Sequence, residues 1–414
     1  MKTLFRLCML LVLIANIRCT MVAQDLKIFG FGQMYYRNQF FTEENIRQRL
    51  GTNVPGKNNL FLLQQANLML SSDFGRGFSF FGNLEFTNNF DLNRNFGNFT
   101  IQEFLVRYKN SDGSFQVKFG SFLPKFNSFL EIYNRFPLMP YIFRPAVYET
   151  QLQNFFAFDD FFPPKANIQI YGVLPLNDQI TLDYAVYHAN PEFSFMTTAV
   201  GGSAGAINTT TNMQYGGRLG IKADFGKAGS LTLGGSITSD LDNQRNQTVG
   251  GIMTALGRPA VNLGDVSRTR IGGDITYSVA GFTLNAEIIK VSTNMDANQQ
   301  TIFDNNLGRN STFPSTIFAN GKAMESLDKL TYYGALSYQV LEDVAVYTMY
   351  SHIEDKGSLL LQSGVSSLSI GATYSPIENI LIKAQYFNLQ INEPNNLNVF
   401  NRARSILLGT SVMF

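Results

Sequence analysis

The stretch RARSILLGTSVMF, residues 402–414, alternates between two kinds of residue. Every second position, counted back from the last, is apolar or Thr: Phe414, Val412, Thr410, Leu408 and Ile406. The positions between them are mostly small or polar, and this period of two is typical of a β-strand with one apolar face. The free edge of such a strand promotes aggregation in a soluble protein, whereas in a membrane barrel the last strand pairs with the first. The stretch therefore predicts the closing strand of a transmembrane β-barrel.

The overall composition is also typical of a membrane barrel. Charged residues make up 15% of the 414 residues, whereas soluble globular proteins contain about 25%. Aromatic residues make up 13%, with 37 Phe, 18 Tyr and no Trp, and the mean hydropathy of −0.03 is too low for a helical membrane protein. The length is sufficient for two or three soluble domains or for one barrel of about 16 strands.

The N-terminal segment, residues 1–23, has the features of a secretory signal peptide. A basic start precedes an apolar run at residues 7–15, and Ala23 is a suitable residue for cleavage. The run is too short for a transmembrane helix, which needs about 20 apolar residues. We therefore expect this segment to be removed and residues 24–414 to form one exported barrel domain.

Both cysteines, Cys8 and Cys19, lie in this N-terminal segment. The mature chain would therefore have no disulfide and no thiol chemistry. The residues before Cys19 do not match the cleavage site of a lipoprotein. Removal of the segment would change the formal net charge from +1 to −2, because three basic residues are lost. The mature chain therefore has no bulk positive charge that would suggest binding of nucleic acid.

Segments with strand alternation recur in pairs that are joined by short turns rich in Gly, Asn, Asp and Pro. Seven such hairpins are predicted, at residues 62–70 with 78–86, 100–108 with 115–119, 167–173 with 180–188, 218–225 with 231–237, 271–279 with 282–288, 332–340 with 344–350, and 368–374 with 380–386. Residues 26–40 and 402–414 supply the first and last strands. The prediction is an all-β antiparallel barrel of about 16 strands, and no segment shows a helical pattern.

The connections between the hairpins are longer and more polar than the turns within them. They comprise residues 41–58, 90–97, 122–165, 189–212, 240–267, 293–327, 354–363 and 392–401. Short turns on one side of the membrane and long loops on the other are typical of outer-membrane barrels, in which the long loops are extracellular. A soluble β-sandwich or propeller is the alternative, but sandwich strands average about 5–6 residues, which is shorter than the segments here.

The third long connection, residues 122–165, is the longest and is dense in Phe, Tyr, Leu and Pro. Loops of more than about 15 residues are usually functional or disordered, and this composition argues against disorder. A long aromatic loop must bury its side chains, and the interior of a wide barrel is the available space. We therefore expect this connection to fold into the barrel.

Several of these features resemble the porins of Gram-negative outer membranes. The strand count, the signal peptide, the terminal Phe414 and the long third connection are similar to those of the general trimeric porins. The segment VKFGSFLPKF, residues 117–126, resembles the strand-to-loop passage of the phosphate-selective porin O/P family. The resemblance implies a homotrimer, a third loop that narrows the pore, and a role of Phe414 as a sorting signal for the barrel-assembly machinery. The dense ladder of arginines that the phosphate-selective porins use is not seen in this sequence.

The resemblance also implies which residues lie at the constriction of the pore. The candidates are the charged residues of the third connection: Lys125, Glu131, Arg135, Arg144, Glu149, Asp159, Asp160 and Lys165. The alternative is that several of them only stabilise the loop against the wall or face solvent.

Alternation within the strands assigns further charges to the interior. If apolar residues such as Leu219 and Ile221 contact lipid, charged residues of opposite parity face the channel. The charges assigned inward are basic Arg107, Lys118, Arg218, Lys222, Arg268, Arg270, Lys329 and Lys383, and acidic Glu85, Glu103, Asp183, Asp224, Asp274 and Glu287. A basic patch formed by Arg218, Lys222, Arg268 and Arg270 would give a slight preference for anions. The alternative is a wall on which opposite charges compensate each other.

Little in the sequence suggests catalysis or a cofactor. His188 and His352 have Ser, Asn or acidic neighbours, but no spacing is diagnostic of a hydrolase, and two separated histidines without cysteines form no metal site. We predict a non-enzymatic porin for small anionic or neutral solutes, in contact with outer-membrane lipid and with lipopolysaccharide at Arg402 and Arg404. The alternatives are a barrel scaffold that binds a surface or secretion partner through its long loops, and a carrier for hydrophobic solutes.

Overall fold

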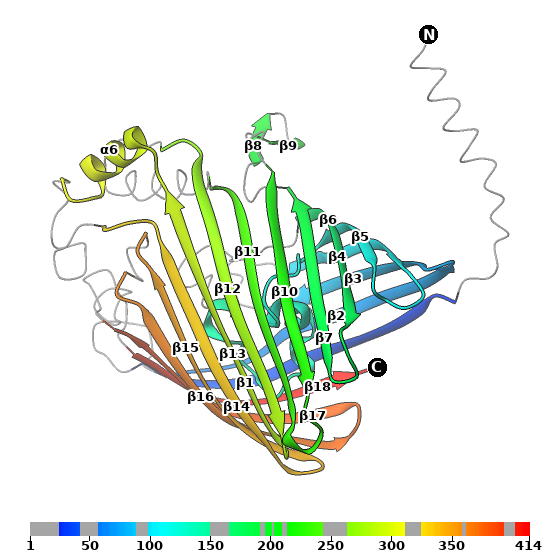
Figure 1. Ribbon diagram of the computed structural model, residues 1–414. Helices are drawn as coiled ribbons and strands as arrows, with labels where there is room; N and C mark the ends of the chain where they lie inside the picture. The colour runs from blue at the N-terminus through cyan, green and yellow to red at the C-terminus, as the bar shows by residue number, and fades with distance from the viewer. Residues whose placement is uncertain are drawn as a thin grey trace.

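Sixteen antiparallel strands close into a single barrel (Figure 1). The computed structural model describes residues 25–41, 57–87, 98–149, 165–190, 195–200, 203–208, 213–242, 263–310, 324–357, 362–392 and 402–414. The barrel closes where β18 (Arg402–Met413) pairs with β1 (Lys27–Phe41). The fold class and the number of strands predicted from the alternation are therefore confirmed. The predicted signal peptide lies outside the described residues.

Each segment predicted as a strand lies in a strand of the barrel. Between the first and the last, the barrel strands are β2 (Lys57–Gly75), β3 (Phe78–Thr87), β4 (Asn98–Lys109), β5 (Gln116–Phe122), β6 (Lys165–Pro175), β7 (Ile180–Ala189), β10 (Gln214–Asp224), β11 (Ser230–Asp242), β12 (Val266–Val279), β13 (Phe282–Asn294), β14 (Lys329–Leu341), β15 (Val344–Asp355), β16 (Val365–Ile377) and β17 (Ile380–Ile391). Several strands are longer than predicted, because polar residues at their ends continue the backbone pairing. Strand β11, for example, pairs with β12 as far as Asp242.

The end of the chain continues the pairing of the closing strand. The Gly30 N–H donates to the Phe414 carbonyl at 2.9 Å, and the Phe414 N–H donates to the Gly30 carbonyl at 2.9 Å. A Cβ atom at position 30 would lie 2.6 Å from the Phe414 ring, so the glycine leaves room for that ring. The last residue therefore takes part in closing the barrel.

The two faces of the strands differ as the alternation requires. Large apolar side chains are exposed on the outer face, for example Leu219, Ile271 and Ile406. The positions of opposite parity are buried inside the barrel and include many polar and charged residues, such as Arg218 and Arg270. A soluble protein has the reverse arrangement, whereas an apolar exterior with a polar interior is typical of barrels in lipid.

The connection at residues 189–212, which was predicted to be a polar loop, contains a β-hairpin. Strands β8 (Phe195–Val200) and β9 (Ser203–Asn208) form a separate two-stranded sheet. Because this hairpin stays outside the barrel, β7 pairs directly with β10. The hairpin lies at the same end of the barrel as helix α6 (Ala297–Asn306) (Figure 1).

Helix α6 shows that the prediction of no helix is wrong. A capping box starts the helix: the Asp296 side chain accepts from the Gln299 N–H at 2.8 Å, and the Gln299 side chain accepts from the Asp296 N–H at 3.0 Å. The helix is short and its apolar residues lack a strong helical period, so only this local signal marks it in the sequence. None of the helices in the described ranges is both long and apolar enough to cross a membrane.

Candidate functional site

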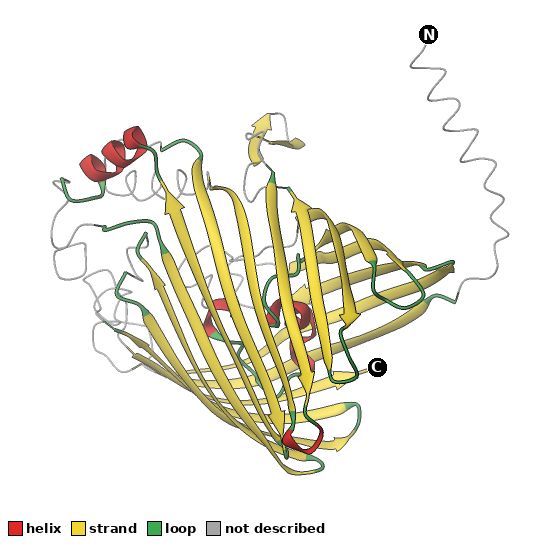
Figure 2. Cartoon of the chain, viewed as in Figure 1, coloured by secondary structure: helices red, strands yellow, loops and turns green. Residues whose placement is uncertain are grey.

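The chain after β5 crosses the interior of the barrel. This inner segment, residues 123–149, contains the short helices α3 (Phe129–Ile132), η1 (Tyr133–Leu138) and η2 (Ala146–Tyr148). The Asn127 N–H donates to Ser236 Oγ of β11 at 3.1 Å, and the Arg144 side chain donates to Gln65 of β2. Strands β2 and β11 are nearly opposite each other in the closed barrel, so a segment that contacts both lies inside it (Figure 2).

Aromatic residues of the inner segment fill one side of the interior. The rings of Phe129 and Tyr148 stack with centroids 4.5 Å apart, and Tyr141 meets Tyr347 of β15 edge to face at 4.8 Å. Phe136 is fully buried in the same cluster. Burial of aromatic rings gives the largest apolar stabilisation per residue, so this packing holds the segment against the strands from β13 through β18 to β1. We call this half of the interior the filled side.

Glu287 on β13 fixes the start and the end of the inner segment. Its carboxylate accepts from the Phe129 N–H at 2.6 Å, from Ser128 Oγ at 3.0 Å and from the Tyr148 hydroxyl at 2.8 Å. Burial, reinforced by the nearby Glu287, raises the pKa of Tyr148 well above its ordinary value, so the hydroxyl stays protonated and remains a donor. One buried carboxylate therefore joins two parts of the segment to the wall.

Lys383 on β17 fixes the middle of the inner segment. It is 1% exposed, and its Nζ donates to the carbonyls of Pro137 at 2.8 Å and Tyr141 at 3.2 Å and to Gln33 Oε1 at 2.6 Å. Burial also raises the pKa of the hydroxyl of Tyr141, one of these partners, to about 12. A buried ammonium group is costly unless its donors are used, and here each of its three protons has an acceptor. Lys383 was predicted to face inward, and in the structure its side chain lies between the barrel wall and the inner segment, where it contacts that segment.

Two candidates from the third connection stabilise the segment itself. The Arg144 guanidinium lies over the rings of Tyr133 at 4.4 Å and Phe136 at 4.9 Å. The Arg144 N–H donates to a carboxylate oxygen of Glu149 at 2.9 Å. Arg144 and Glu149 are both buried, so their charges lie within the packing and not on an open surface. Asp159 and Asp160 lie outside the described residues.

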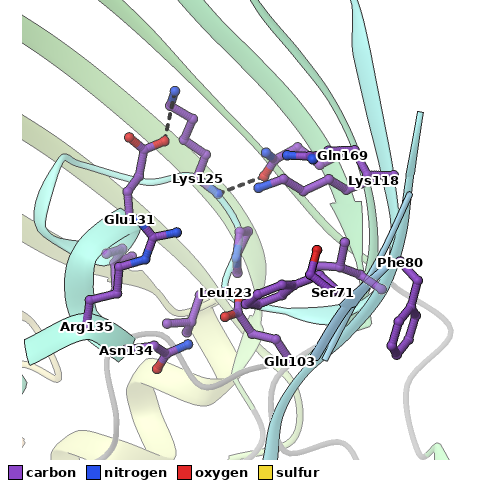
Figure 3. Close-up of a pocket in the computed structure, with 15 residues that line it drawn as sticks. Ser71, Phe80, Glu103, Lys118, Leu123, Lys125, Glu131, Asn134, Arg135 and Gln169 are labelled. Carbon is purple, nitrogen blue, oxygen red and sulfur yellow. Dashed lines mark hydrogen bonds and ion pairs between the residues drawn. The ribbon is translucent and has the colours of Figure 1, made fainter. Parts of the chain in front are cut away.

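The other side of the interior contains a cavity of about 190 Å³ between the inner segment and strands β2 to β6 (Figure 3). Charged side chains reach it from both walls: Lys125, Glu131 and Arg135 from the inner segment, and Glu103, Arg107 and Lys118 from the strands. The apolar part of its lining comes from Phe80, Phe81, Leu105, Leu123, Pro124 and Leu130, and the remaining residues are Ser71, Asn134 and Gln169. We call this space the charged cavity, and this half of the interior the open side.

Lys125 is the best-paired charge of the charged cavity. Its Nζ lies 2.8 Å from Glu131 Oε1 and 2.6 Å from Asp183 Oδ1 of β7. Its backbone N–H donates to Gln169 Oε1 at 2.8 Å. Figure 3 shows Glu131 and Arg135 on the inner segment and Lys118 and Glu103 on the strands that face it. Three of the predicted constriction candidates, Lys125, Glu131 and Arg135, therefore line the same cavity, together with charged residues of β4 and β5 that were not among the candidates.

Three cations of the charged cavity, Arg107, Lys118 and Arg135, form no ion pair with any residue that the structure describes. The Lys118 ammonium lies 4.6 Å from the ring centre of Tyr171 and 5.5 Å from that of Phe122. Aromatic faces attract a cation, and the carboxylates of Glu103 and Glu131 also act on Lys118 from a greater distance. The wall of the cavity therefore carries more cations than carboxylates, with Arg107, Lys118, Lys125 and Arg135 against Glu103 and Glu131.

The arginines predicted to form a basic patch are instead paired. Arg218 forms a two-point pair with Asp274 across Gly234, where a Cβ atom would lie 2.2 Å from the guanidinium. Arg268 lies 2.8 Å from an Asp240 oxygen, and Arg270 lies 3.2 Å from it. Lys222 is exposed near the end of β10, outside this cluster. The wall here follows the compensating arrangement that the sequence analysis kept as the alternative.

Neither histidine faces the interior. The rings of His188 and Tyr215 lie on the outer face with centroids 4.6 Å apart and planes tilted by 34°, and His352 on the outer face has Nδ1 3.1 Å from Ser366 Oγ. Within the described ranges, no three His, Cys, Asp or Glu residues form a cluster that would hold a metal ion.

Comparison with known proteins identifies the fold through structure and not through sequence. No protein-family model and no curated protein matches the sequence. The anion-selective porin from Comamonas acidovorans is 12% identical, with a TM-score of 0.53 over 94% of this chain and 100% of that chain. The outer membrane channel DcaP of Acinetobacter baumannii is 13% identical, with a TM-score of 0.53 over 94% and 97%. OmpT of Vibrio cholerae in its trimer form is 12% identical, with a TM-score of 0.50 over 94% and 99%.

The structural similarity extends over almost the whole of this chain, and therefore over its closed barrel of sixteen strands. At sequence identities of 12–13%, this similarity shows the architecture of the chain. It does not show which solute passes, the ion selectivity or the oligomeric state. This chain has the fold of the outer-membrane porins.

Proposed function

We propose that the protein is an outer-membrane porin through which small hydrophilic solutes and ions diffuse passively. The charged cavity carries this proposal, because it is a polar space inside a closed barrel whose outer face is apolar. A water-filled interior with charged groups is how wide barrels conduct small solutes. The inner segment, as the expected constriction loop, narrows this passage from one side.

The proposed site of action is the cell outer membrane. The apolar outer face contacts lipid there, and Arg402 and Arg404 at the end of β18 contact lipopolysaccharide. The signal peptide at residues 1–23 directs export. The barrel-assembly machinery reads the C-terminal strand with Phe414, and the mature protein forms a homotrimer, as the trimer form of the similar OmpT does.

A slight preference for anions is part of the proposal. Its support is the charged cavity, in which Arg107, Lys118 and Arg135 are not paired with carboxylates of the wall. Free basic groups along a passage attract anions, whereas paired groups contribute little net field. The preference is therefore assigned to the cations of the open side and not to Arg218, Arg268 and Arg270.

The rival functions have less support in the described residues. A carrier for hydrophobic solutes would need apolar space inside the barrel, but the aromatic side chains of the inner segment pack against each other and the wall on the filled side. A scaffold for a surface partner would use the long connections. Among the described residues, the β8–β9 hairpin is a candidate for binding such a partner. A pull-down that compares the full protein with a variant lacking the hairpin would test this function.

Conductance in planar bilayers under a salt gradient tests the proposed function. The folded barrel is first verified by its altered gel mobility without heating. We expect stepwise current increases and a reversal potential that reports a modest preference for chloride over potassium. A folded protein that produces no steps would rule out the channel. A reversal potential on the cation side would rule out the anion preference while leaving the channel intact.

Deletion of Phe414 tests its proposed role in assembly. We expect the truncated protein to reach the outer membrane at a severalfold lower level, whereas the molecules that do assemble conduct normally. Phe414→Ala is the matched variant, because it removes the ring while leaving the backbone hydrogen bonds of the last residue with Gly30 in place. Normal surface levels of the truncated protein would exclude the sorting role.

A further inference from the structure

We propose that the charged cavity is a binding subsite for small organic monocarboxylates, that is, for anions with one carboxylate and an apolar body. This inference rests on the proposed channel function and deepens it by naming a class of solute. It combines three properties of the cavity: cations without an ion pair, an apolar wall next to them, and a small volume with a carboxylate, Glu103, that disfavours a second negative charge.

The first property is positive charge without a partner. Elsewhere inside the barrel several cations are paired with carboxylates, as Arg218 is with Asp274 and Lys329 is with Asp355 at 3.3 Å. Arg107, Lys118 and Arg135 line the charged cavity and form no ion pair with described residues. A carboxylate that enters the cavity can therefore bind to these three cations without breaking an existing ion pair.

The second property is an apolar surface beside these cations. Phe81 of β3 and Leu123 of the inner segment are partly exposed and line the same cavity as Lys118. Leu105 and Leu130 also line it, but each is only 5% exposed. Inorganic anions gain nothing from such a wall, whereas the carbon body of an organic acid is removed from water against it.

The third property is the size and the remaining charge of the cavity. Its volume of about 190 Å³ is below the range of about 300–1,000 Å³ that is usual for drug-sized ligands, so a small solute fits it. Glu103 also lines the space, and Glu131 lines it while paired with Lys125. The charge of Glu103 repels a second carboxylate or a doubly charged phosphate, which selects monoanions by exclusion.

Block of the ion current tests the subsite. The purified full-length protein is placed in planar bilayers in KCl, and sodium benzoate, hexanoate, acetate, succinate, inorganic phosphate or phenylalanine is added. We expect benzoate and hexanoate to reduce the current in a saturable manner at concentrations at least fivefold below those of the other four. Equal potency of acetate and benzoate would overturn the role of the apolar wall. Equal or greater potency of succinate, phosphate or phenylalanine would overturn the class.

Variants locate the effect. Lys118→Gln, Arg135→Gln and Leu123→Asn should each weaken the block by benzoate severalfold, and the exposed Arg135 provides the variant least able to disturb folding. Lys227→Gln in η3 (Gly226–Ala228) removes the same charge in an exposed turn and should leave the block unchanged. A block that survives all three cavity variants would place the binding elsewhere and overturn the inference. Absence of any conductance in the wild type would instead contradict the proposed channel.

Discussion

The two halves of the barrel interior use charged residues in opposite ways. On the filled side, Glu287 and Lys383 are almost fully buried, and each donates to or accepts from three groups, most of them on the inner segment. On the open side, Arg107 and Arg135 are exposed to the cavity and form no ion pair with described residues. The filled side holds the inner segment in position, and the open side contains the charged cavity.

The difference follows from the cost of burial. A charge that is removed from water must be satisfied by well-placed partners, so the buried charges of the filled side are committed to structure. A charge that stays in contact with water has no such requirement and remains available to a solute. The same residue types thus hold the segment on one side and attract ions on the other.

The largest effect is expected from Glu287→Ala. Hydrogen bonds to a charged group contribute about 1.5–3 kcal/mol each, and this change removes three of them, so we expect a loss of about 3 kcal/mol or more in barrel stability. The inner segment should also loosen, which would increase single-channel conductance and current noise. Heat-dependent gel mobility and bilayer recordings measure the two effects. Glu103→Ala on the open side is the control, and equal behaviour of the two variants would contradict the division of the interior.

Lys383→Met should have the next largest effect. Methionine fills a similar volume, but the carbonyls of Pro137 and Tyr141 lose their donor, at a cost of about 1–3 kcal/mol for each group left unsatisfied. The temperature at which the folded band converts to the unfolded band should therefore fall. The matched variant Lys118→Met should leave that temperature unchanged and should alter the ion selectivity. A reversed pattern would show that the open side carries the structural charge.

A smaller effect is expected on ion selectivity, when an arginine without an ion pair is compared with a paired arginine. Arg135→Gln removes an unpaired charge at the charged cavity and should move the reversal potential toward cations. Arg268→Gln should move it less, because Asp240 retains Arg270 at 3.2 Å. Both variants lose one positive charge, so bilayer measurements in a salt gradient compare them directly. Equal shifts would mean that the field depends on net charge alone and not on pairing.

The smallest effect is expected from a pair of adjacent glycines on β11. Gly234→Ala places a Cβ atom 2.2 Å from the Arg218 guanidinium, so that side chain must move away from Asp274, at a cost of about 1 kcal/mol. Gly235→Ala is the control, because a Cβ atom there meets nothing within 4 Å. Thermal conversion on gels should separate the two variants by a few degrees. Identical conversion temperatures would show that the Arg218–Asp274 pair does not contribute to stability.

Much of the fold was predictable because strand alternation is a local property. The period of two in residues 402–414 gave the closing strand, and the register in which Leu408 pairs with Tyr36 agrees with it. Helix α6 was missed because its signal is a capping box and not a period. Asp240 was missed as an inward charge because β11 extends beyond the segment with clear alternation.

The candidate site was predictable only in part. Parity placed Lys118 and Arg107 inside the barrel, and the composition of residues 122–165 indicated that the third connection must bury its aromatic rings. Neither pattern tells which charges are neutralised, because that depends on which side chains meet across the sheet and across the interior.

The sequence by itself determined the barrel, its sixteen strands, the orientation of each strand face and the aromatic character of the inner segment, since all of these follow from neighbouring residues. Only the tertiary structure decided which side of the interior is filled. Lys383 meets Pro137 from 246 positions away, and Asp240 meets Arg268 from the adjacent strand. Closure of the barrel brings these residues together, and the resulting pairing leaves Arg107, Lys118 and Arg135 at the charged cavity without an ion pair to any described residue.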